Sequence, residues 1–283
     1  MGIILCLIFI VYGGNFMFAN ENDFEELRFI LNSKIRSKLL ICLFYHEDNL
    51  DNLRVILDKP SSTVLHTLHE LSVLNLVIKR GKTFYLTSRG HIFVLVMYKF
   101  LTNLYFIKRN TDFISNHSIE SCPDFSLKDL YLLINGKYIE SEESNLSKPL
   151  NTYLKYIKFS NELNIILPIF SKIHLDAILR LVSKGNCDRL IIITSPSILK
   201  SLKRFGYIRK LKNLSTSIDF SLLKYSGELD LFLTFSKEFT TINFFFADGQ
   251  FDNSILFVDE SDSGVKWSKN LFDYYLENSS KII

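Results

Sequence analysis

One stretch of this 283-residue chain, Ser33 to His91, limits the possible folds more than any other part. Apolar residues recur at three- and four-residue spacing in SKIRSKLLICLFYHED and again in NLDNLRVILDK, so each segment predicts an amphipathic helix. The segment PSSTVLHTLHELSVLN predicts a third helix, with Pro60 at its start, where the missing N–H costs nothing. The residues expected to face the core are Ile35, Leu39, Leu40, Leu43 and Phe44, then Leu50, Leu53, Ile56 and Leu57, then Val64, Leu65, Leu68, Leu71 and Leu74.

After the third helix the pattern changes to that of strands. LVIK and TFYLT flank a turn at Arg80, Gly81 and Lys82, which predicts a hairpin between Val77 and Leu86. Three helices followed by a basic hairpin are typical of a winged helix-turn-helix domain, which we place at residues 24–91.

The chemistry of this segment suits duplex DNA. Short polar side chains near the start of the third helix could contact base edges in a major groove, and a basic hairpin could contact phosphates. The segment 33–91 carries nine Lys or Arg and five Asp or Glu, so it holds an excess of positive charge. We predict base contacts from Ser61, Ser62, Thr63, His66 and Thr67, and phosphate contacts from Lys79, Arg80 and Lys82.

Simpler interpretations exist for the same residues. A polar helix face is most often only solvated, and a helix-turn-helix pattern is frequent by chance, so the argument depends on the ordered set of elements. His66 and His69 have a spacing that could hold a metal, but no cysteine or carboxylate cluster accompanies them, and we predict neither a metal nor a cofactor.

The remaining length is enough for a second domain. SRGHIFVLVMYKFLTNLYFIKRN predicts a helix with apolar residues on more than one face, which we interpret as a connector and dimerisation helix at residues 92–115. Lys99, Thr102 and Asn103 interrupt it too much for a membrane span. Residues 120–283 alternate buried strands and helices, which predicts an α/β effector domain with a central sheet. The four cysteines are scattered without a CxxC pair, as expected in a reducing cytoplasm.

An open α/β sheet usually binds ligands at the carboxyl ends of its strands. We therefore predict a pocket for a small effector near Pro168, Thr194 and Asp248. The turn ADGQFDN also contains Asp252, and turn formation explains both aspartates better than ligand binding does. Trp267 lies on the apolar face of the last predicted helix and is expected in the core.

The chain from about Phe24 onward resembles archaeal winged helix-turn-helix regulators with a methanogenesis-regulator type effector domain. The resemblance is carried by FILNSKIRSKLL, DKPSSTVLHTLHEL, YLTSRG, SEESNLSKPLNTYL, LPIFSKIHLDAIL and FFFADGQFDNSILFVDESDSGVKWSKNLFDYY. It implies a cytoplasmic transcription factor of a methanogenic archaeon. It also implies an effector domain similar to the phospholipase-D-like sensor domains of sugar-responsive archaeal regulators, without an established ligand.

No enzymatic activity is expected. A phospholipase-D-type site needs a His followed two residues later by Lys, and none of the six histidines has Lys at that position. The chain also lacks GxxxxGK[ST] and GxGxxG phosphate-binding loops. His174 and Asp176 lie two apart on a predicted helix, so their side chains should point in different directions.

Residues 1–19 are apolar and uncharged and have several explanations. Their longest unbroken apolar run is too short for a bilayer span, and they lack the basic start of a signal peptide. Gly2 is present, but Cys6 is not the Ser or Thr of a myristoylation signal. The favoured hypothesis is translation from Met17, and the alternatives are a short membrane anchor and a buried N-terminal strand or helix.

Two functions from different classes remain open. The first is a ligand-responsive regulator that binds duplex DNA as a homodimer. The second is a scaffold, or a protein tethered to a membrane through residues 1–18, that acts through protein contacts and has little affinity for DNA. A salt-dependent gel shift with duplex DNA would separate the two.

Overall fold

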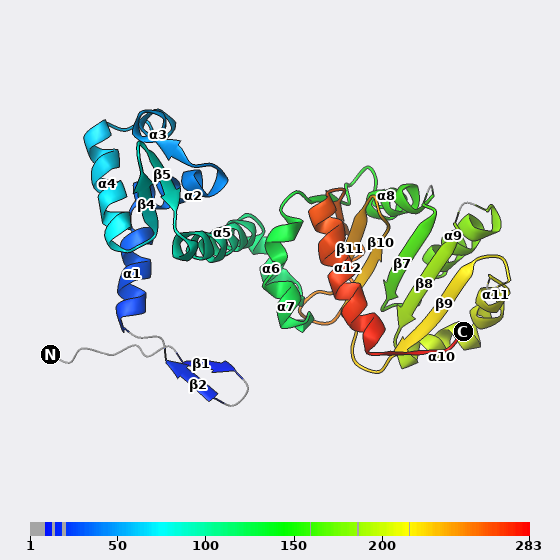
Figure 1. Cartoon of the computed structure of the whole chain (residues 1–283). Helices are drawn as coiled ribbons and strands as arrows, with labels where there is room; N and C mark the ends of the chain where they lie inside the picture. The colour runs from blue at the N-terminus through cyan, green and yellow to red at the C-terminus, as the bar shows by residue number, and fades with distance from the viewer. Residues whose placement is uncertain (1–8, 13–14, 19–20, 159, 186, 215) are drawn as a thin grey trace. The chain divides into compact units, whose positions relative to one another are not determined.

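The computed structural model describes residues 9–12, 15–18, 21–158, 160–185, 187–214 and 216–283. These residues divide into two compact units, one up to Leu101 and one from Thr102 onward (Figure 1). The architecture is mixed α/β: an N-terminal winged helix-turn-helix followed by a large sheet with helices on both faces. This arrangement agrees with the fold class predicted from sequence.

Near the N-terminus, β1 (Phe9–Tyr12) and β2 (Asn15–Phe18) form an antiparallel two-stranded ribbon. Residues 1–8, 13–14 and 19–20 lie outside the described part of the chain, so most of the apolar N-terminal segment does too. Translation from Met17 therefore stays a prediction.

The first unit consists of the helices and the hairpin expected from the sequence, with two additions. An acidic helix, α1, precedes the predicted set, and β3 adds a third strand, so the small sheet has the order β3-β5-β4. The elements are α1 (Glu21–Leu31), α2 (Lys34–Tyr45), β3 (Asp48–Asn49), α3 (Leu50–Leu57), α4 (Ser61–Val73), β4 (Val77–Arg80), β5 (Thr83–Leu86) and the first part of α5 (Ser88–Arg109).

Local signals in the sequence set the helix boundaries. The Ser33 hydroxyl accepts a hydrogen bond from the Arg36 N–H at the start of α2, and the Asn49 side chain does the same for Asn52 at the start of α3. α3 ends at Asp58, whose φ of 51° is left-handed and turns the chain toward α4.

The core of the first unit follows the predicted apolar pattern with two corrections. Most of the expected residues are buried or pack against the core. Ile56 and Leu65, however, are 50% and 47% exposed. On α4 the buried stripe is Val64, Thr67, Leu68 and Leu71, so a threonine occupies the position expected for a leucine.

Helix α5 carries apolar residues on more than one face, as predicted, and Phe106 near its end is 5% exposed and lies in the core of the second unit. Val94 and Met97 lie in the core, whereas Ile92, Val96 and Phe100 are 63%, 67% and 54% exposed. The helix begins at Ser88 and ends at Arg109, and a separate helix, α6 (Thr111–Asn116), follows it.

Among the described residues, α5 is also the one helix long and apolar enough to cross a bilayer, judged by length and composition alone. The predicted interruption by Lys99, Thr102 and Asn103 is therefore too weak to exclude a span by composition. Near its C-terminal end, however, α5 packs against other parts of the protein. The Asn103 amide N–H donates to the Lys128 carbonyl at 2.8 Å, and the Asn103 amide oxygen accepts from the Tyr131 N–H at 2.8 Å.

The second unit is built on an eight-stranded mixed sheet with the order β13-β9-β8-β7-β10-β11-β12-β6. Strands β7, β8 and β9 are parallel, and the other neighbours are antiparallel. The strands are β6 (Lys137–Glu140), β7 (Glu162–Leu167), β8 (Arg189–Thr194), β9 (Asp219–Tyr225), β10 (Leu231–Phe235), β11 (Thr240–Phe244), β12 (Ile255–Asp259) and β13 (Ser279–Lys281).

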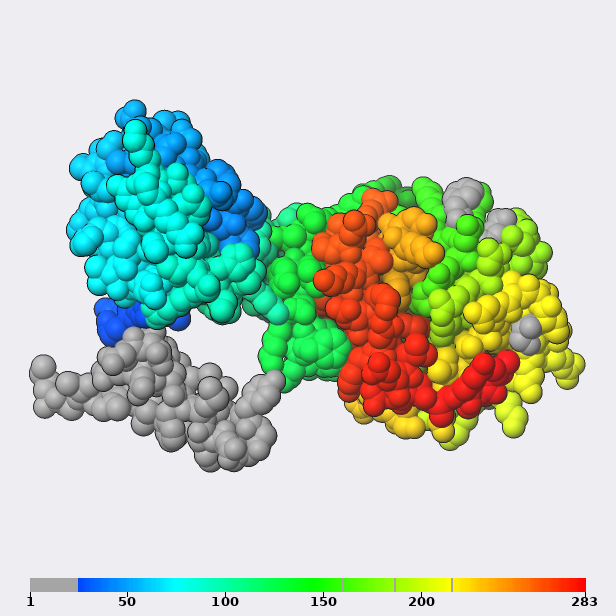
Figure 2. Space-filling view, viewed as in Figure 1, coloured from blue at the N-terminus to red at the C-terminus, as the bar shows by residue number. Residues whose placement is uncertain are grey.

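Helices cover both faces of this sheet. One core lies between the sheet and α8 (Lys148–Ile157), α9 (Lys172–Ser183), α10 (Pro196–Arg204) and α11 (Tyr207–Leu214). The second core lies under α12 (Asp262–Glu277) and the segment 106–133, which contains α7 (Asp124–Leu127) and two short 3-10 helices, Ile119–Ser121 and Leu130–Leu133. In Figure 2, α12 runs along the surface of this unit.

Because both faces of the sheet are covered, every residue of β10 and β11 is buried, including the polar residues Thr240, Thr241 and Asn243 of β11. Trp267 on α12 is 2% exposed, as predicted, and its indole N–H donates to the Ser126 carbonyl at 2.9 Å.

Candidate nucleic-acid interface and effector site

Helix α4 presents most of the residues that were predicted to contact bases. Ser62 and His66 are exposed, and Ser61 and Thr63 are half-buried. Thr67 is a correction, because it is 4% exposed and its hydroxyl donates to the Thr63 carbonyl at 2.9 Å. Thr67 follows Val64 by three residues, so it lies on the core side of the helix and cannot contact a base.

An ion-pair network connects the C-terminal half of α4 to α2. Arg36 on α2 makes two hydrogen bonds to the Glu70 carboxylate, at 2.9 and 2.7 Å, and stacks 3.5 Å above the Phe29 ring. The hydrogen bond from Arg36 lowers the pKa of Glu70, outweighing the opposite effect of burial. Glu70 also lies 3.4 Å from His66 Nε2, which is one helical turn away. The orientation of His66 is therefore coupled to the α2–α4 contact.

The wing is the two-residue turn at Gly81 and Lys82 between β4 and β5. Gly81 has a φ of 61°, which glycine adopts without a steric penalty. Lys79, Arg80 and Lys82 are all exposed. The Lys79 ammonium lies 5.4 Å from the Phe84 ring and the Arg80 guanidinium 5.7 Å from the Tyr85 ring. Aromatic rings of β5 therefore support the stems of two wing cations while their charges remain in solvent.

The three residues predicted for the effector pocket lie at or beyond the same edge of the large sheet. Pro168 directly follows β7, and Thr194 ends β8. Thr194 is fully buried, and its hydroxyl donates to the Leu167 carbonyl at 2.6 Å. Asp248 lies in the loop after β11, where its carboxylate accepts the Gln250 N–H at 2.9 Å. Thr194 and Asp248 thus both make local hydrogen bonds at this edge.

A cavity of about 230 Å³ nevertheless lies near this edge, between α8, the start of α9 and the loop after β11. Its lining residues are neutral or apolar: Leu146, Ser147, Pro149, Leu150, Tyr153, Ile169, Ser171, Ile173, His174, Asn243, Phe251, Asn253 and Leu256. None of these lining residues was predicted from the sequence, because they come from four separate segments of the chain.

His174 is the titratable imidazole of this cavity. Its Nδ1 lies 2.6 Å from the Ser171 hydroxyl, and its ring packs 4.9 Å from Tyr153 and 5.0 Å from Phe232. Burial lowers the pKa of His174 to about 4, so the ring is neutral at physiological pH. Asp176 bonds Tyr207 instead, at 2.8 Å, which agrees with the prediction that the two side chains point apart.

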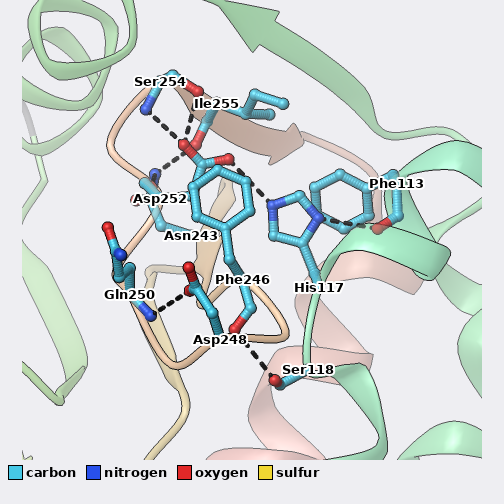
Figure 3. A network of polar contacts seen from close by, with 10 residues as sticks. All are labelled: Phe113, His117, Ser118, Asn243, Phe246, Asp248, Gln250, Asp252, Ser254 and Ile255. Atoms are coloured by element: carbon cyan, nitrogen blue, oxygen red, sulfur yellow. Dashed lines mark hydrogen bonds and ion pairs between the residues drawn. The ribbon is translucent and has the colours of Figure 1, made fainter.

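The sequence analysis missed a buried pair, His117 and Asp252, shown in Figure 3. The two side chains are 3% and 2% exposed, and His117 Nε2 lies 3.0 Å from Asp252 Oδ2. The imidazole is stacked between the Phe113 and Phe246 rings, at 4.0 and 5.0 Å. The partners are 135 positions apart, so no local pattern could connect them.

Further hydrogen bonds hold both side chains of this pair in place. The Phe113 carbonyl accepts a hydrogen bond from His117 Nδ1, 2.8 Å away. Asp252 Oδ1 accepts from the Ser254 N–H and hydroxyl at 2.8 and 2.6 Å. The contact between Nε2 and Oδ2 therefore connects the segment after α6 to the loop after β11.

This loop joins the buried pair to the cavity. Phe251 and Asn253 line the cavity, whereas Asp252, between them, contacts His117. Asn243 also lines the cavity, and its amide donates to the Ile255 carbonyl at 2.5 Å, near the end of the same loop. The cavity and the Asp252–His117 pair therefore share this loop.

Comparison with known proteins identifies relatives over both units. Residues 24–105 match a family described as "Methanogenesis regulatory protein FilR1, N-terminal domain", and residues 146–278 match the middle domain of the same protein. A curated relative, the methanogenesis regulatory protein FilR1 of Methanothrix harundinacea (strain 6Ac), is 25% identical over 275 residues. That match covers 93% of this chain and 59% of the relative, so the chain spans about three fifths of the relative's length.

Solved structures show weaker likeness. TrmBL2, described as an archaeal chromatin protein with a novel mode of DNA binding, aligns with 13% identity and a TM-score of 0.41, covering 91% of this chain and 98% of TrmBL2. The dimethyltransferase RosA of Streptomyces davawensis aligns with 9% identity and a TM-score of 0.24, over 71% and 64% of the two chains. Superpositions this loose support no argument about function. The two family matches fall one in each unit and in chain order, so the chain is similar to the N-terminal and middle domains of the methanogenesis regulatory protein FilR1.

Proposed function

We propose that this protein is a transcriptional regulator of a methanogen that binds duplex DNA through its winged unit. The observation that carries the proposal is the pairing, within one unit, of a helix with exposed Ser62 and His66 and a wing with three exposed cations. A helix of this size fits a major groove, and wing cations neutralise phosphates. The FilR1 domain matches support the same function.

Replacing Lys79, Arg80 and Lys82 together with alanine tests the proposal. Each lost phosphate contact lowers the salt dependence of log K by about 0.9, so the slope should fall by about two to three. The control variant replaces Lys34 and Lys38, which are exposed on α2, and should leave the slope unchanged. Unchanged affinity and slope in the wing variant would show that the wing does not contact DNA.

The protein would act as a homodimer through α5. Ile92, Val96 and Phe100 are spaced four residues apart and are all more than half exposed, so they form one apolar ridge along the helix. A second copy of the same helix would bury this ridge, and twofold dimers match paired DNA half-sites. Light scattering should then give twice 32.9 kDa.

Val96→Glu should convert the dimer to a monomer while leaving the winged core intact, because its side chain is 67% exposed in the chain alone. The matched control is Val55→Glu, whose side chain is 71% exposed on α3. A wild-type protein that is monomeric at micromolar concentration contradicts the dimer.

The second unit would sense a small effector in the cavity beside His174. None of the described lining residues is charged at neutral pH, so the cavity suits an uncharged molecule with apolar surface and one or two hydrogen-bonding groups. Ligand binding would reach the rest of the protein through the loop that holds Asp252. No catalytic step is assigned to either unit.

A thermal-shift screen of uncharged metabolites against the full chain tests this part. A true effector should raise the unfolding temperature of the second unit and change DNA affinity. Filling the cavity by Leu150→Trp should abolish the thermal shift. An effector whose stabilisation survives this substitution binds elsewhere.

A further inference from the structure

The densest positive charge in the chain does not lie in the winged unit but on α10 and α11. Residues 196–214 contain six basic residues and no Asp or Glu: Lys200, Lys203, Arg204, Arg209, Lys210 and Lys212. The whole chain has 33 basic and 30 acidic residues, so without these six its net charge would be −3 instead of +3. Soluble surfaces normally intersperse both signs, and a single-sign region generates a directed field.

The two helices present all of this charge to solvent. Leu202, Tyr207 and Leu211 form their apolar side and are buried in the core against the sheet. All six basic side chains lie on the opposite side and are exposed. An exposed aromatic ring, Phe205 at 55%, lies between the helices and stacks on Phe170 at 4.8 Å.

Little of this charge is neutralised inside the protein. Among the ion pairs of the described residues, none involves Lys200, Lys203 or Arg209. Arg204 and Lys210 instead lie 5.5 and 4.7 Å from aromatic rings, which leaves their charge uncompensated. The surface is therefore available to an external anion.

The positive surface continues onto α9 through an open groove of about 470 Å³. Arg180 and Lys210 line this groove from opposite helices, with Ser183 and Asn213 beside them. The one acidic residue in the lining is Asp176, whose carboxylate accepts the Tyr207 hydroxyl at 2.8 Å. The groove thus offers two cations and neutral hydrogen-bonding groups to an anion.

We propose that the α10–α11 surface, defined as these six basic residues, contacts backbone phosphates of duplex DNA as a second, sequence-independent contact. Flexible lysines spread along two helices suit an extended polyanion, whereas a small anion needs convergent donors. This inference rests on the proposed DNA-binding function, and it adds a contact that the winged unit does not supply.

The test replaces Lys200, Lys203, Arg204 and Arg209 with alanine in the full chain. Affinity for a random-sequence duplex should fall by about tenfold to a hundredfold at low salt, and the salt slope by about two to four. The preferred sequence recovered by selection should not change, because phosphate contacts carry no sequence information.

The matched control replaces Lys266 and Lys269 on α12, exposed lysines on a helix that packs on the other face of the same sheet. It should retain wild-type affinity and slope, because α12 also carries Asp262, Asp273 and Glu277. Fluorescence of Trp267, the single tryptophan, verifies in every variant that the second unit is folded.

The outcomes are separable. If the wing variant loses DNA binding and the α10–α11 variant retains wild-type affinity and slope, the proposed function stands and this inference is wrong. If wild-type protein binds no duplex, the proposed function itself fails. If the α10–α11 residues instead determine affinity for single-stranded RNA or polyglutamate, with duplex binding unchanged, the assignment to duplex DNA is overturned.

Discussion

His66 in the first unit and His117 in the second show how differently the two units use polar side chains. The His66 side chain is 73% exposed and free to contact a partner, while the His117 side chain is 3% exposed, stacked between aromatic rings and paired with Asp252. A surface histidine can be changed with little effect on stability, but its loss alters recognition. A buried, paired histidine supports the fold, so its replacement mainly lowers the free energy of unfolding.

The units also differ in charge. The winged unit mixes acids and bases along its helices, with Glu70 held by Arg36, whereas α10 and α11 carry bases alone. The protein's small net charge of +3 therefore conceals two separated basic surfaces, the wing and the α10–α11 surface. The net charge of the chain therefore indicates neither basic surface.

The largest effect that distinguishes the units should come from Asp252→Ala. Removing one partner of a buried pair leaves His117 uncompensated and typically costs about 3–5 kcal/mol. Urea unfolding followed by Trp267 fluorescence reports the second unit alone, since that residue is the single tryptophan. The control Asp248→Ala, in the same loop but exposed, should cost less than about 1 kcal/mol. Equal losses of unfolding free energy in the two variants would show that the buried pair adds no stability beyond that of an exposed aspartate.

In the first unit, Gly90→Ala should be the most disruptive small change. An added Cβ would lie 2.0 Å from the Leu76 carbonyl oxygen, a backbone atom that cannot move aside. Overpacking of this kind costs about 1–3 kcal/mol, which should lower the stability of the winged unit without changing the Trp267 transition. Circular dichroism reports the helices of both units, so a transition that it shows and Trp267 fluorescence does not is assigned to the first unit. Gly249→Ala, in the second unit, would strain a backbone with a φ of 84° but should leave the winged transition unchanged.

Acidification should weaken the second unit through His174. The pKa of His174 is lowered from 6.5 to about 4 in the folded protein, so between these values the unfolded chain binds the proton and the folded chain does not. Stability is therefore fully present above pH 6.5 and falls as pH drops toward 4, by at most about 2 kcal/mol between pH 7 and pH 5.

Comparing wild type with His174→Gln by urea unfolding at pH 7 and pH 5 checks this sign. The variant should lose less stability on acidification than wild type. His66→Gln is the matched control in the first unit and should not change the loss measured by Trp267. If His174→Gln is as acid-sensitive as wild type, burial of this imidazole does not determine the pH dependence.

The smallest stability change, and the sharpest functional one, is expected on α4. His66→Ala should change stability by less than about 0.5 kcal/mol, as is usual for exposed positions, but should alter the preferred DNA sequence. Thr67→Val keeps a similar shape at a buried position and should leave the preferred sequence unchanged. Selection of binding sites from random duplexes measures both. The opposite result would place the base-contacting face on the other side of α4.

Much of the fold was predictable because local sequence patterns repeat the geometry of helices and strands. The apolar stripe around Leu68 and the basic wing were both predicted from the sequence. The predictions of burial on α4 were wrong at two positions: Leu65 is apolar but exposed, and Thr67 is polar but buried. The spacing of a residue from Val64 determines whether it faces the core, and its polarity does not.

The sequence by itself determined the order of elements and the basic wing. These depend on periodicity and chain direction, which are local properties. Only the tertiary structure decided which side chains meet: it joined His117 to Asp252 across 135 positions, and it enclosed His174 in a cavity from four segments. Such contacts depend on how separate elements pack, and the free energy of a buried polar pair is realised only after that packing has excluded water.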